Sequence, residues 1–198
     1  MGKCSNSNNT TESTKQAMTK TLDITTKQIV IINLIFRFRF LDRLQIQKFL
    51  NHKDEARTNG WLKNLTEKEY LGRNLKYNHS SSTNLSIYHL AKNGIRLLKT
   101  QNIENAQTVQ KYYRENERSA SFIASCLLLA DIYLDLITRS TTETSFAMYL
   151  KSDYPNHPLK ELLTDLKPSA YIKQTHENYP KYYLLEVFYN LPPERLRQ

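Results

Sequence analysis

The chain has 198 residues, of which 39% are hydrophobic and 11% aromatic, and it carries a formal net charge of +9. That apolar content is sufficient for the packed core of one domain or of two small ones. Only 4 glycines occur, and neither a G-x-G-x-x-G nor a G-x-x-x-x-G-K-[ST] loop is present, which argues against nucleotide binding by those loops. The two cysteines, Cys4 and Cys126, indicate neither a zinc site nor a disulfide framework, and they fit a reducing cytoplasm.

The start of the chain does not have the pattern of a targeting segment. Residues 1–22 are polar, rich in Ser, Thr and Asn, and lack the apolar core of a signal peptide, so we expect a disordered tail there. The longest apolar stretch, residues 120–130, is too short to span a bilayer. These features predict a soluble, cytoplasmic protein without a membrane partner.

The net positive charge of the chain comes entirely from its first half. Residues 1–100 hold 17 Lys and Arg against 7 Asp and Glu, a formal charge of +10, whereas residues 101–198 hold 11 against 12. Such asymmetry between two halves predicts a polyanionic partner for the basic half. It does not by itself distinguish DNA from RNA or from a membrane surface.

Two helix starts follow one another in the basic half. Thr25 and Asp42 can each cap a helix, and Gln28 and Gln45, three residues later, complete a capping box in each case. Apolar residues flank both boxes at the spacing of a hydrophobic staple. We therefore expect one helix that begins near residue 25 and a second that begins near residue 42 and ends near residue 51.

Aromatic and basic residues alternate where the chain leaves the first helix. Phe36, Phe38 and Phe40 are interleaved with Arg37 and Arg39. Neighbouring residues of an extended segment point to opposite sides. The pattern predicts that the rings point inward and the guanidinium groups outward.

A third helix is expected over residues 54–68, with two distinct faces. Trp61, Leu62 and Leu65 fall on one side, which is predicted to face the core. Gly60 is unusual in a helix interior, where glycine costs roughly 1 kcal/mol relative to alanine. Close approach of the backbone to DNA and a tight helix crossing would each explain it. The opposite side, which can donate to phosphates and read purine edges, carries Arg57, Gly60, Asn64 and Lys68, with Thr58 and Lys63 beside them.

A hairpin is expected after the third helix. Residues 73–77 and 85–90 alternate as strands do, and they enclose a polar loop over residues 77–84. Three helices followed by a hairpin is the order of a winged helix-turn-helix, whose third helix enters the DNA major groove. We predict this domain over residues 23–100, with double-stranded DNA as its partner. The candidate DNA contacts are Arg43, Lys53, Arg57, Thr58, Lys63, Asn64, Lys68, Arg73, Lys76, His79 and Ser81.

The second half reads as a separate small α/β domain over residues 117–198. It follows a polar segment over residues 101–116, which is predicted to be a linker or a short solvated helix. A long helix over residues 117–139 carries two apolar stripes side by side, which indicates a helix covered on two sides. It is either a central core helix or the interface of a homodimer. Three strand-like runs follow, with a short helix at residues 160–166, which suggests a small sheet.

Three segments of the chain resemble the replication-relaxation family: Thr25-Thr26-Lys27-Gln28, Phe36-Arg37-Phe38-Arg39-Phe40-Leu41 and Tyr88-His89-Leu90-Ala91-Lys92-Asn93-Gly94. The resemblance covers nearly everything after Leu22. It implies a winged-helix protein of a plasmid or conjugative element, associated with plasmid replication and its control. It also implies an α+β fold whose second half is a degenerate restriction-endonuclease-like core. We expect a divergent or truncated member.

The family resemblance implies an acidic motif that this chain keeps only in part. Pro-Asp is expected on one strand and Leu-Glu-x-Asp on the next; Glu186 matches, but Ser169 replaces the first acid and Phe188 the last. A nuclease of this kind needs clustered carboxylates to hold Mg²⁺. The 5 histidines show no ligand spacing either. We therefore expect no catalytic residue, no metal and no cofactor, and hence no enzyme.

The resulting hypothesis is a sequence-specific double-stranded DNA-binding protein of a plasmid or mobile element. It would act in replication control or transcription regulation, with replication proteins as further partners and a homodimer formed through the helix at 117–139. One alternative is a metal-dependent nuclease that uses Glu186 with Asp165 and Glu161. The other is a winged helix that serves protein–protein contact.

Overall fold

The computed structural model describes residues 24–74, 86–100 and 111–188. The first part contains α1 (Thr26–Phe38), β1 (Leu41–Asp42), α2 (Arg43–Phe49), α3 (Glu55–Glu67), β2 (Leu71–Asn74), β3 (Ile87–Leu90) and α4 (Lys92–Thr100). The second part contains the 3-10 helix η1 (Lys111–Glu117), α6 (Ala120–Thr138), β4 (Thr144–Leu150), the 3-10 helix η2 (Tyr154–Asn156), α7 (Lys160–Leu166), β5 (Ala170–His176) and β6 (Tyr179–Leu185). The expected tail over residues 1–22 lies outside the described residues.

The first part has the topology of a winged helix-turn-helix. Its three strands form an antiparallel sheet in the order β1-β3-β2, with Leu41 opposite Tyr88 and Leu71 opposite Leu90. α1, α2 and α3 precede the β2–β3 hairpin, as in winged-helix domains. The predicted fold of this half is therefore confirmed.

Both predicted capping boxes are present. The Thr25 hydroxyl accepts a hydrogen bond from the Gln28 backbone N–H at 3.4 Å, and the Asp42 carboxylate accepts one from the Gln45 N–H at 2.8 Å. In each box the glutamine side chain accepts from the cap residue's own N–H, at 2.8 Å and 3.1 Å. Each cap satisfies donors that the first helical turn leaves free. The two helices therefore begin where the sequence predicts.

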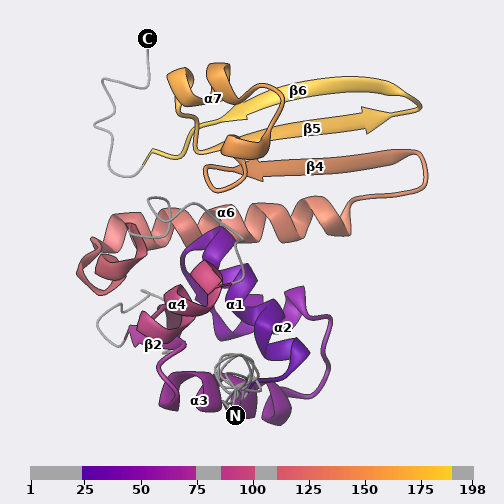
Figure 1. Cartoon of the computed structure of the whole chain (residues 1–198). Coiled ribbons are helices and arrows are strands. Elements are labelled where there is room, and N and C mark those ends of the chain that lie inside the picture. Colours follow the sequence, from indigo (N-terminus) through magenta and orange to yellow (C-terminus); the bar gives the residue numbers. More distant parts are fainter. Residues whose placement is uncertain (1–23, 75–85, 101–110, 189–198) are drawn as a thin grey trace, which may run out of the picture.

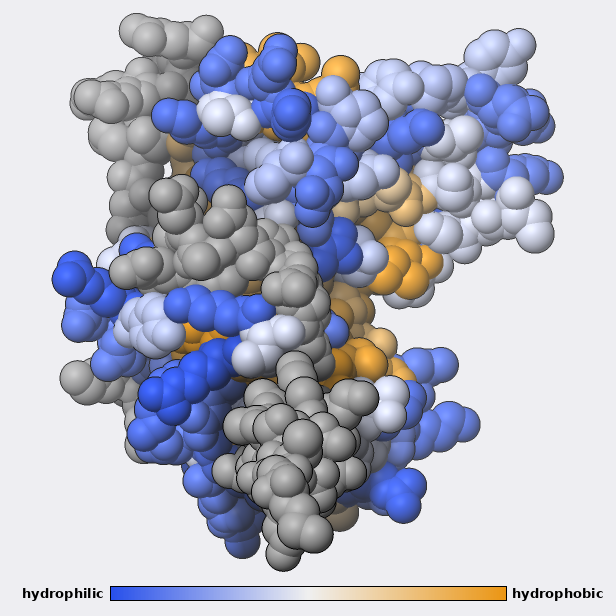
Figure 2. Space-filling model, in the orientation of Figure 1, coloured by the Kyte–Doolittle hydropathy of each residue, from blue (hydrophilic) through white to orange (hydrophobic). Residues whose placement is uncertain are grey.

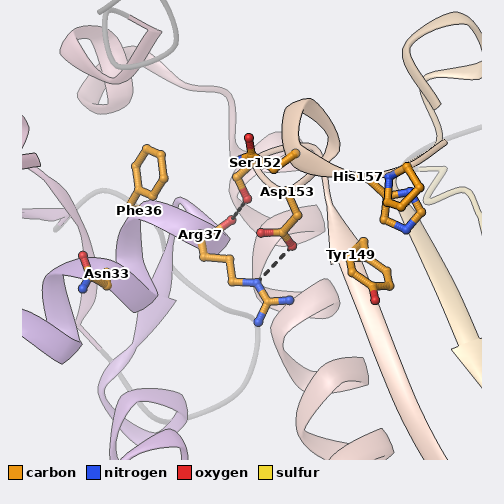
Figure 3. A pocket seen from close by; sticks show the side chains of 9 residues that line it. Asn33, Phe36, Arg37, Tyr149, Ser152, Asp153 and His157 are labelled. Atoms are coloured by element: carbon orange, nitrogen blue, oxygen red, sulfur yellow. Dashed lines mark hydrogen bonds and ion pairs between the residues drawn. The ribbon is translucent and has the colours of Figure 1, made fainter. Parts of the chain in front are cut away.

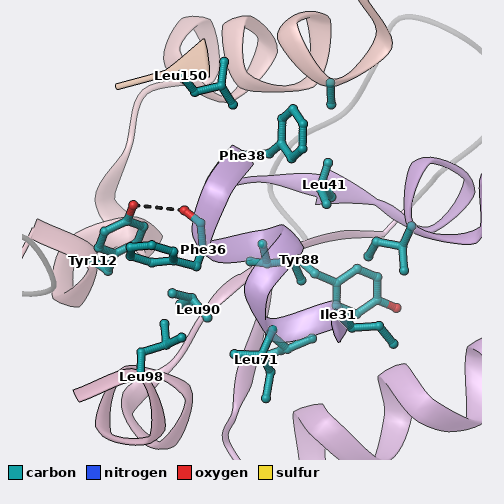
Figure 4. Close-up of a cluster of buried hydrophobic side chains, with 14 of the residues drawn as sticks. Ile31, Phe36, Phe38, Leu41, Leu71, Tyr88, Leu90, Leu98, Tyr112 and Leu150 are labelled. Atoms are coloured by element: carbon teal, nitrogen blue, oxygen red, sulfur yellow. Dashed lines mark hydrogen bonds between the residues drawn. The ribbon is translucent and has the colours of Figure 1, made fainter. Parts of the chain in front are cut away.

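α6 lies between the winged helix and a second sheet (Figure 1). It packs against α1 and α2 on one side and against β4 on the other, so the predicted central core helix is confirmed. One hydrophobic cluster runs from Ile31 and Phe38 through Ala130 to Met148 and Ile172. Figure 4 shows the part of this cluster around α1, β3 and α4. Burial of each large apolar side chain contributes roughly 1.5–3 kcal/mol, so a shared core ties the layers together.

The expected linker is wrong over its last residues. Residues 101–110 lie outside the described part, but residues 111–117 form η1, which packs against the winged helix. Tyr112 is buried and donates its hydroxyl proton to the Phe36 carbonyl at 2.9 Å (Figure 4). Glu115 is buried as well. An aromatic ring and a paired carboxylate give this polar-looking segment a place in the core, so it is not a solvated connection.

The second sheet is antiparallel, in the order β4-β5-β6. β5 and β6 are joined by the two-residue turn Glu177-Asn178, both with positive φ (47° and 73°), as a type I′ hairpin turn requires. α7 covers one end of this sheet through Leu163, which packs with Tyr154 and Tyr171. The α+β class is confirmed, and the restriction-endonuclease-like core remains a prediction.

Candidate nucleic-acid interface

α3 is held in place by its N-cap and by three inward side chains. The Asp54 carboxylate accepts a hydrogen bond from the Arg57 backbone N–H at 3.0 Å. Thr58, Leu62 and Leu65 are fully buried, at spacings of four and three residues along the helix. This periodicity places them on one face. The opposite face of α3 is exposed to solvent.

The solvent face of α3 is rotated from the face that the sequence suggests. Thr58, a predicted DNA contact, is buried, and its hydroxyl donates to the Asp54 carbonyl at 3.1 Å, so this assignment is wrong. Asn64 is half-buried, and its side-chain oxygen accepts a hydrogen bond from the Gln28 amide at 2.9 Å, which ties α3 to α1. The exposed residues of α3 are Glu55, Ala56, Arg57, Asn59, Gly60, Lys63 and Glu67.

Asn59 is the exposed polar residue that sequence reasoning missed. Its amide can donate to and accept from an adenine edge in the major groove. The signal was available, because Thr58, Leu62 and Leu65 have the spacing of one helical face. The polarity of threonine suggests a surface position, but a Thr hydroxyl that donates to the carbonyl four residues earlier is compatible with burial.

Gly60 faces open space on α3. A Cβ atom built at this position would meet no heavy atom within 4 Å. The tight helix crossing offered as one explanation for this glycine is therefore wrong. An open groove of about 440 Å³ lies beside it, between α3 and the start of α1. Its lining consists of Ile24, Thr25, Gln28, Gly60, Trp61, Asn64 and Lys68.

The basic candidates around α3 fall into an exposed group and an engaged group. The exposed group consists of Lys53, Arg57 and Lys63. Within it, Lys63 Nζ lies 3.9 Å from a carboxylate oxygen of the exposed Glu67. In the engaged group, an Arg43 nitrogen lies 2.5 Å from a Glu55 carboxylate oxygen, and Lys68 is half-buried at the C-cap of the helix. The hydrophilic residues of the winged helix dominate its visible surface in Figure 2.

The hairpin contributes one described candidate. Arg73 is exposed on β2, and its Nε donates to the Ser86 hydroxyl at 2.7 Å. Lys76, His79 and Ser81 lie outside the described residues. The neighbouring strand β3 is buried throughout, so the hairpin base is anchored in the core.

Arg37 and Arg39 face the second half of the chain, so the expected outward orientation is wrong. Arg37 Nε lies 3.1 Å from an Asp153 carboxylate oxygen beside an open pocket of about 660 Å³ (Figure 3). Arg39 pairs with Glu115, whose side chain is fully buried. Burial alone would lower the pKa of Arg37, but the Asp153 carboxylate and the Tyr133 side chain together more than offset this, and the pKa is raised. The rings of Phe36, Phe38 and Phe40 are buried as expected.

The two positions of the degenerate acidic motif meet in space. Ser169 donates its backbone N–H and its hydroxyl proton to the two carboxylate oxygens of Glu186, at 3.2 Å and 2.8 Å. The Ser169 hydroxyl oxygen also accepts from the Val187 N–H at 3.0 Å. Glu161 and Asp165, named for the nuclease alternative, are exposed on α7. Among residues 24–74, 86–100 and 111–188, no three His, Cys, Asp or Glu side chains gather where they could hold a metal ion.

α6 is long and apolar enough to cross a membrane, judged by length and composition alone. A core helix of a soluble protein satisfies the same criterion. Here Gln45 donates from its side-chain amide to the Leu127 carbonyl and to the Asp131 carboxylate, both at 2.9 Å, which binds α6 to α2. The packing on both sides of the helix buries 28% of its apolar stretch, at positions in the first part of the helix, from Ile123 to Ala130.

Comparison with known proteins supplies a family. No curated protein matches the chain. Among solved structures, a MarR mutant from E. coli complexed with operator DNA is 18% identical, covering 57% of this chain and 77% of that one with a TM-score of 0.36, too low to bear on fold or function. The replication-relaxation family model matches residues 32–187, which include most of the winged helix, α6 and the second sheet. The chain therefore belongs to the replication-relaxation family.

Proposed function

We propose that this protein binds double-stranded DNA through the solvent face of α3. The observation that carries the proposal is the composition of that face on a winged-helix scaffold. Arg57, Asn59 and Lys63 are exposed, Gly60 adds no side chain between them, and the exposed acids Glu55 and Glu67 lie at the two ends of the helix. The formal charge of +10 on residues 1–100 supports a polyanionic partner. Duplex DNA is the partner that a winged helix with such a face fits best.

The residues of this face would have different roles in DNA recognition. Lys53, Arg57 and Lys63 would contact phosphates, which position the protein without reading sequence. Asn59 would read a base edge in the major groove, where a good bidentate contact is worth about 1–3 kcal/mol. Gly60 would allow the α3 backbone to approach a phosphate. Arg73 would contact the backbone beside the hairpin.

Fluorescence anisotropy with a labelled duplex from the host replicon tests this proposal. Lys63→Ala is expected to weaken binding to every sequence and to reduce the slope of log affinity against log salt by about 1. Lys160→Ala, an exposed lysine on α7, is the matched control and should leave both quantities unchanged. Equal losses from the two variants would contradict an interface on α3.

A second variant separates sequence reading from charge. Asn59→Ala is expected to lower affinity for the preferred site while leaving affinity for unrelated DNA and the salt slope unchanged. Equal binding of the wild-type protein to all duplexes, at low and moderate salt, would rule out sequence-specific recognition. Unchanged DNA binding in both Arg57→Ala and Lys63→Ala would favour the alternative in which the winged helix contacts a protein.

We further propose that binding, and not catalysis, is the role of this chain in the cytoplasm. Membership of the replication-relaxation family supports an output in replication control on a plasmid or other mobile element, with transcription regulation as the other candidate. The Ser169 contacts occupy both carboxylate oxygens of Glu186, which disfavours the nuclease alternative. Incubation of supercoiled plasmid with the protein and Mg²⁺ or Mn²⁺ tests it: nicking that Glu186→Gln abolishes would overturn the proposal.

A further inference from the structure

Exposed hydrophobic side chains gather at the end of the molecule away from α3. Of the 13 large hydrophobic side chains that the described residues expose, eight lie on α7, on β6 or just beyond them. Figure 2 shows hydrophobic residues at this end, over α7. We call this surface the outer patch. Its main members are Leu162 and Leu166 of α7 and Tyr179, Tyr182, Tyr183 and Leu184 of β6.

β6 is also an open edge of its sheet. It pairs with β5 on one side, and no described strand pairs with the other. His176 and Tyr179 flank the two-residue turn and form a hydrogen-bonded pair, so by alternation the backbone groups of Pro180, Tyr182 and Leu184 point away from β5. Proline has no N–H, which leaves Tyr182 and Leu184 with complete outward donors and acceptors.

We propose that the outer patch binds a second copy of this chain by antiparallel pairing of the two β6 strands. A twofold axis at Tyr183 places Tyr182 opposite the partner's Leu184, and Leu184 opposite the partner's Tyr182. Each such pair exchanges both of its N–H···O bonds. Antiparallel pairing of a strand with its own copy is an isologous contact, in which both subunits use the same surface. The two small sheets become one continuous sheet.

The size of the outer patch suits a protein interface. Its aromatic members are Tyr179, Tyr182, Tyr183 and Phe188, which are 77%, 57%, 46% and 61% exposed. With about 200 Å² for a whole aromatic side chain they expose roughly 500 Å². The exposed leucines bring the total close to the ~800 Å² that each partner buries in a standard interface, although this area is divided between the two faces that flank the β6 edge and the neighbouring α7. Lys181 is the one charged residue within β6, so little like charge opposes the pairing.

The positions of α3 and β6 determine how such a dimer could bind DNA. α3 and β6 lie at opposite ends of the molecule (Figure 1). A dimer joined through β6 would hold its two α3 helices at opposite ends, facing away from each other. Two neighbouring half-sites on one duplex need both helices on the same side. Such a dimer would instead hold two separate duplex segments, a step that rests on the proposed DNA-binding function.

Light scattering of the full chain during size exclusion tests the dimer. The wild-type protein is expected to be a dimer and Leu184→Pro a monomer, because proline removes an outward N–H and no bond to β5. Leu128→Lys, at an exposed leucine on α6, is the matched control and should remain a dimer. A monomeric wild-type protein, or dissociation by Leu128→Lys and not by Leu184→Pro, overturns the proposal.

Two further variants guard against misfolding and fix the register. Tyr182→Lys removes an exposed ring of the patch, which also stacks on Tyr171 with the ring centroids 6.0 Å apart, and should also give a monomer, with an unchanged circular dichroism spectrum. Tyr183→Cys, combined with Cys4→Ser, should form a disulfide-linked dimer on mild oxidation, since facing residues at the axis bring their Cβ atoms within reach. Crosslinking by Tyr179→Cys in the same background, and not by Tyr183→Cys, overturns the proposed pairing.

An assay in which one immobilised duplex retains a second duplex through the protein separates the proposed dimer from the proposed DNA-binding function. An immobilised duplex loaded with wild-type protein should retain a second, labelled duplex, whereas Leu184→Pro should bind the first duplex equally well and retain none of the second. Loss of binding to a single duplex would count against the DNA-binding function alone. Wild-type dimers that bind one duplex and never retain another overturn the opposed arrangement of α3.

Discussion

The strands of the two sheets are covered to different extents. In the winged-helix sheet, which we call the closed sheet, β3 is buried at all four positions, and only Arg73 is exposed among the edge strands β1 and β2. At the edge of the second sheet, β6 is exposed at six of its seven positions. The half with the closed sheet carries the whole net positive charge of the chain. A closed core with a charged surface suits a polyanion, and a nearly neutral half with an open apolar edge suits a protein. In the two proposals above, the two ends of one chain therefore bind different partners.

The first prediction asks whether the two regions are nevertheless one folding unit. Glu115→Ala removes the buried partner of Arg39 and is expected to cost about 3 kcal/mol of unfolding free energy, because it leaves a partly buried charge uncompensated. Both sheets share one core, so thermal unfolding should remain a single transition at a lower temperature. Arg139→Ala, which removes an exposed pair with Asp135, is the control and should cost less than about 1 kcal/mol. Two separate transitions would show that the regions fold independently.

The second prediction concerns the closed region. Gly94 in α4 packs so closely that a Cβ atom would lie 2.3 Å from the Tyr70 carbonyl oxygen. That oxygen accepts a hydrogen bond from the Ala91 N–H at 3.0 Å and cannot move freely. Gly94→Ala is therefore expected to destabilise the protein by about 1–3 kcal/mol, measured by urea unfolding. An increase in stability would contradict the close packing of α4 on the turn that follows α3.

The third prediction makes the same substitution on the charged surface. Gly60→Ala should stabilise the protein by roughly 1 kcal/mol, because α3 gains helix propensity and the new Cβ meets no atom. It should weaken DNA binding if the α3 backbone approaches a phosphate there. Opposite signs in urea unfolding and in anisotropy are the expected result. Unchanged affinity would remove Gly60 from the interface while leaving the stability argument intact.

The fourth and smallest effect is a pH dependence within the closed sheet. Burial of His89 lowers the pKa of its imidazole below the usual 6.5, although its hydrogen bond to Leu90 opposes the shift. The unfolded chain therefore binds more protons than the folded one as the pH falls through 6.5, and stability should decrease until the lower folded pKa is passed. His89→Gln should remove this contribution to the slope of unfolding free energy against pH. Urea unfolding of both proteins at about pH 7.5 and about pH 5 measures the difference; identical slopes would count against a buried neutral histidine.

The local signals of the sequence predicted local structure well. The capping boxes at Thr25 and Asp42 are formed by residues three apart, so their success needed no knowledge of the rest of the fold. The hairpin and the central helix followed from residue periodicity in the same way. The candidate site was harder, because exposure of a residue on α3 depends on what packs against the helix. Thr58 and Asn64 were predicted DNA contacts. In the structure, Thr58 instead donates to the Asp54 carbonyl, and Asn64 accepts from Gln28.

By itself the sequence determined the helix starts, the winged-helix order and the confinement of positive charge to one half, since each depends on residue type and short spacing. Tertiary structure alone decided that Arg37 and Arg39 turn toward Asp153 and Glu115, residues more than 70 positions away along the chain. It also decided which face of α3 is free, and that β6 is left with an open edge. Contacts between segments that are distant in the sequence decide whether a side chain is buried. The residues next to it in the sequence do not specify which distant segment will pack against it.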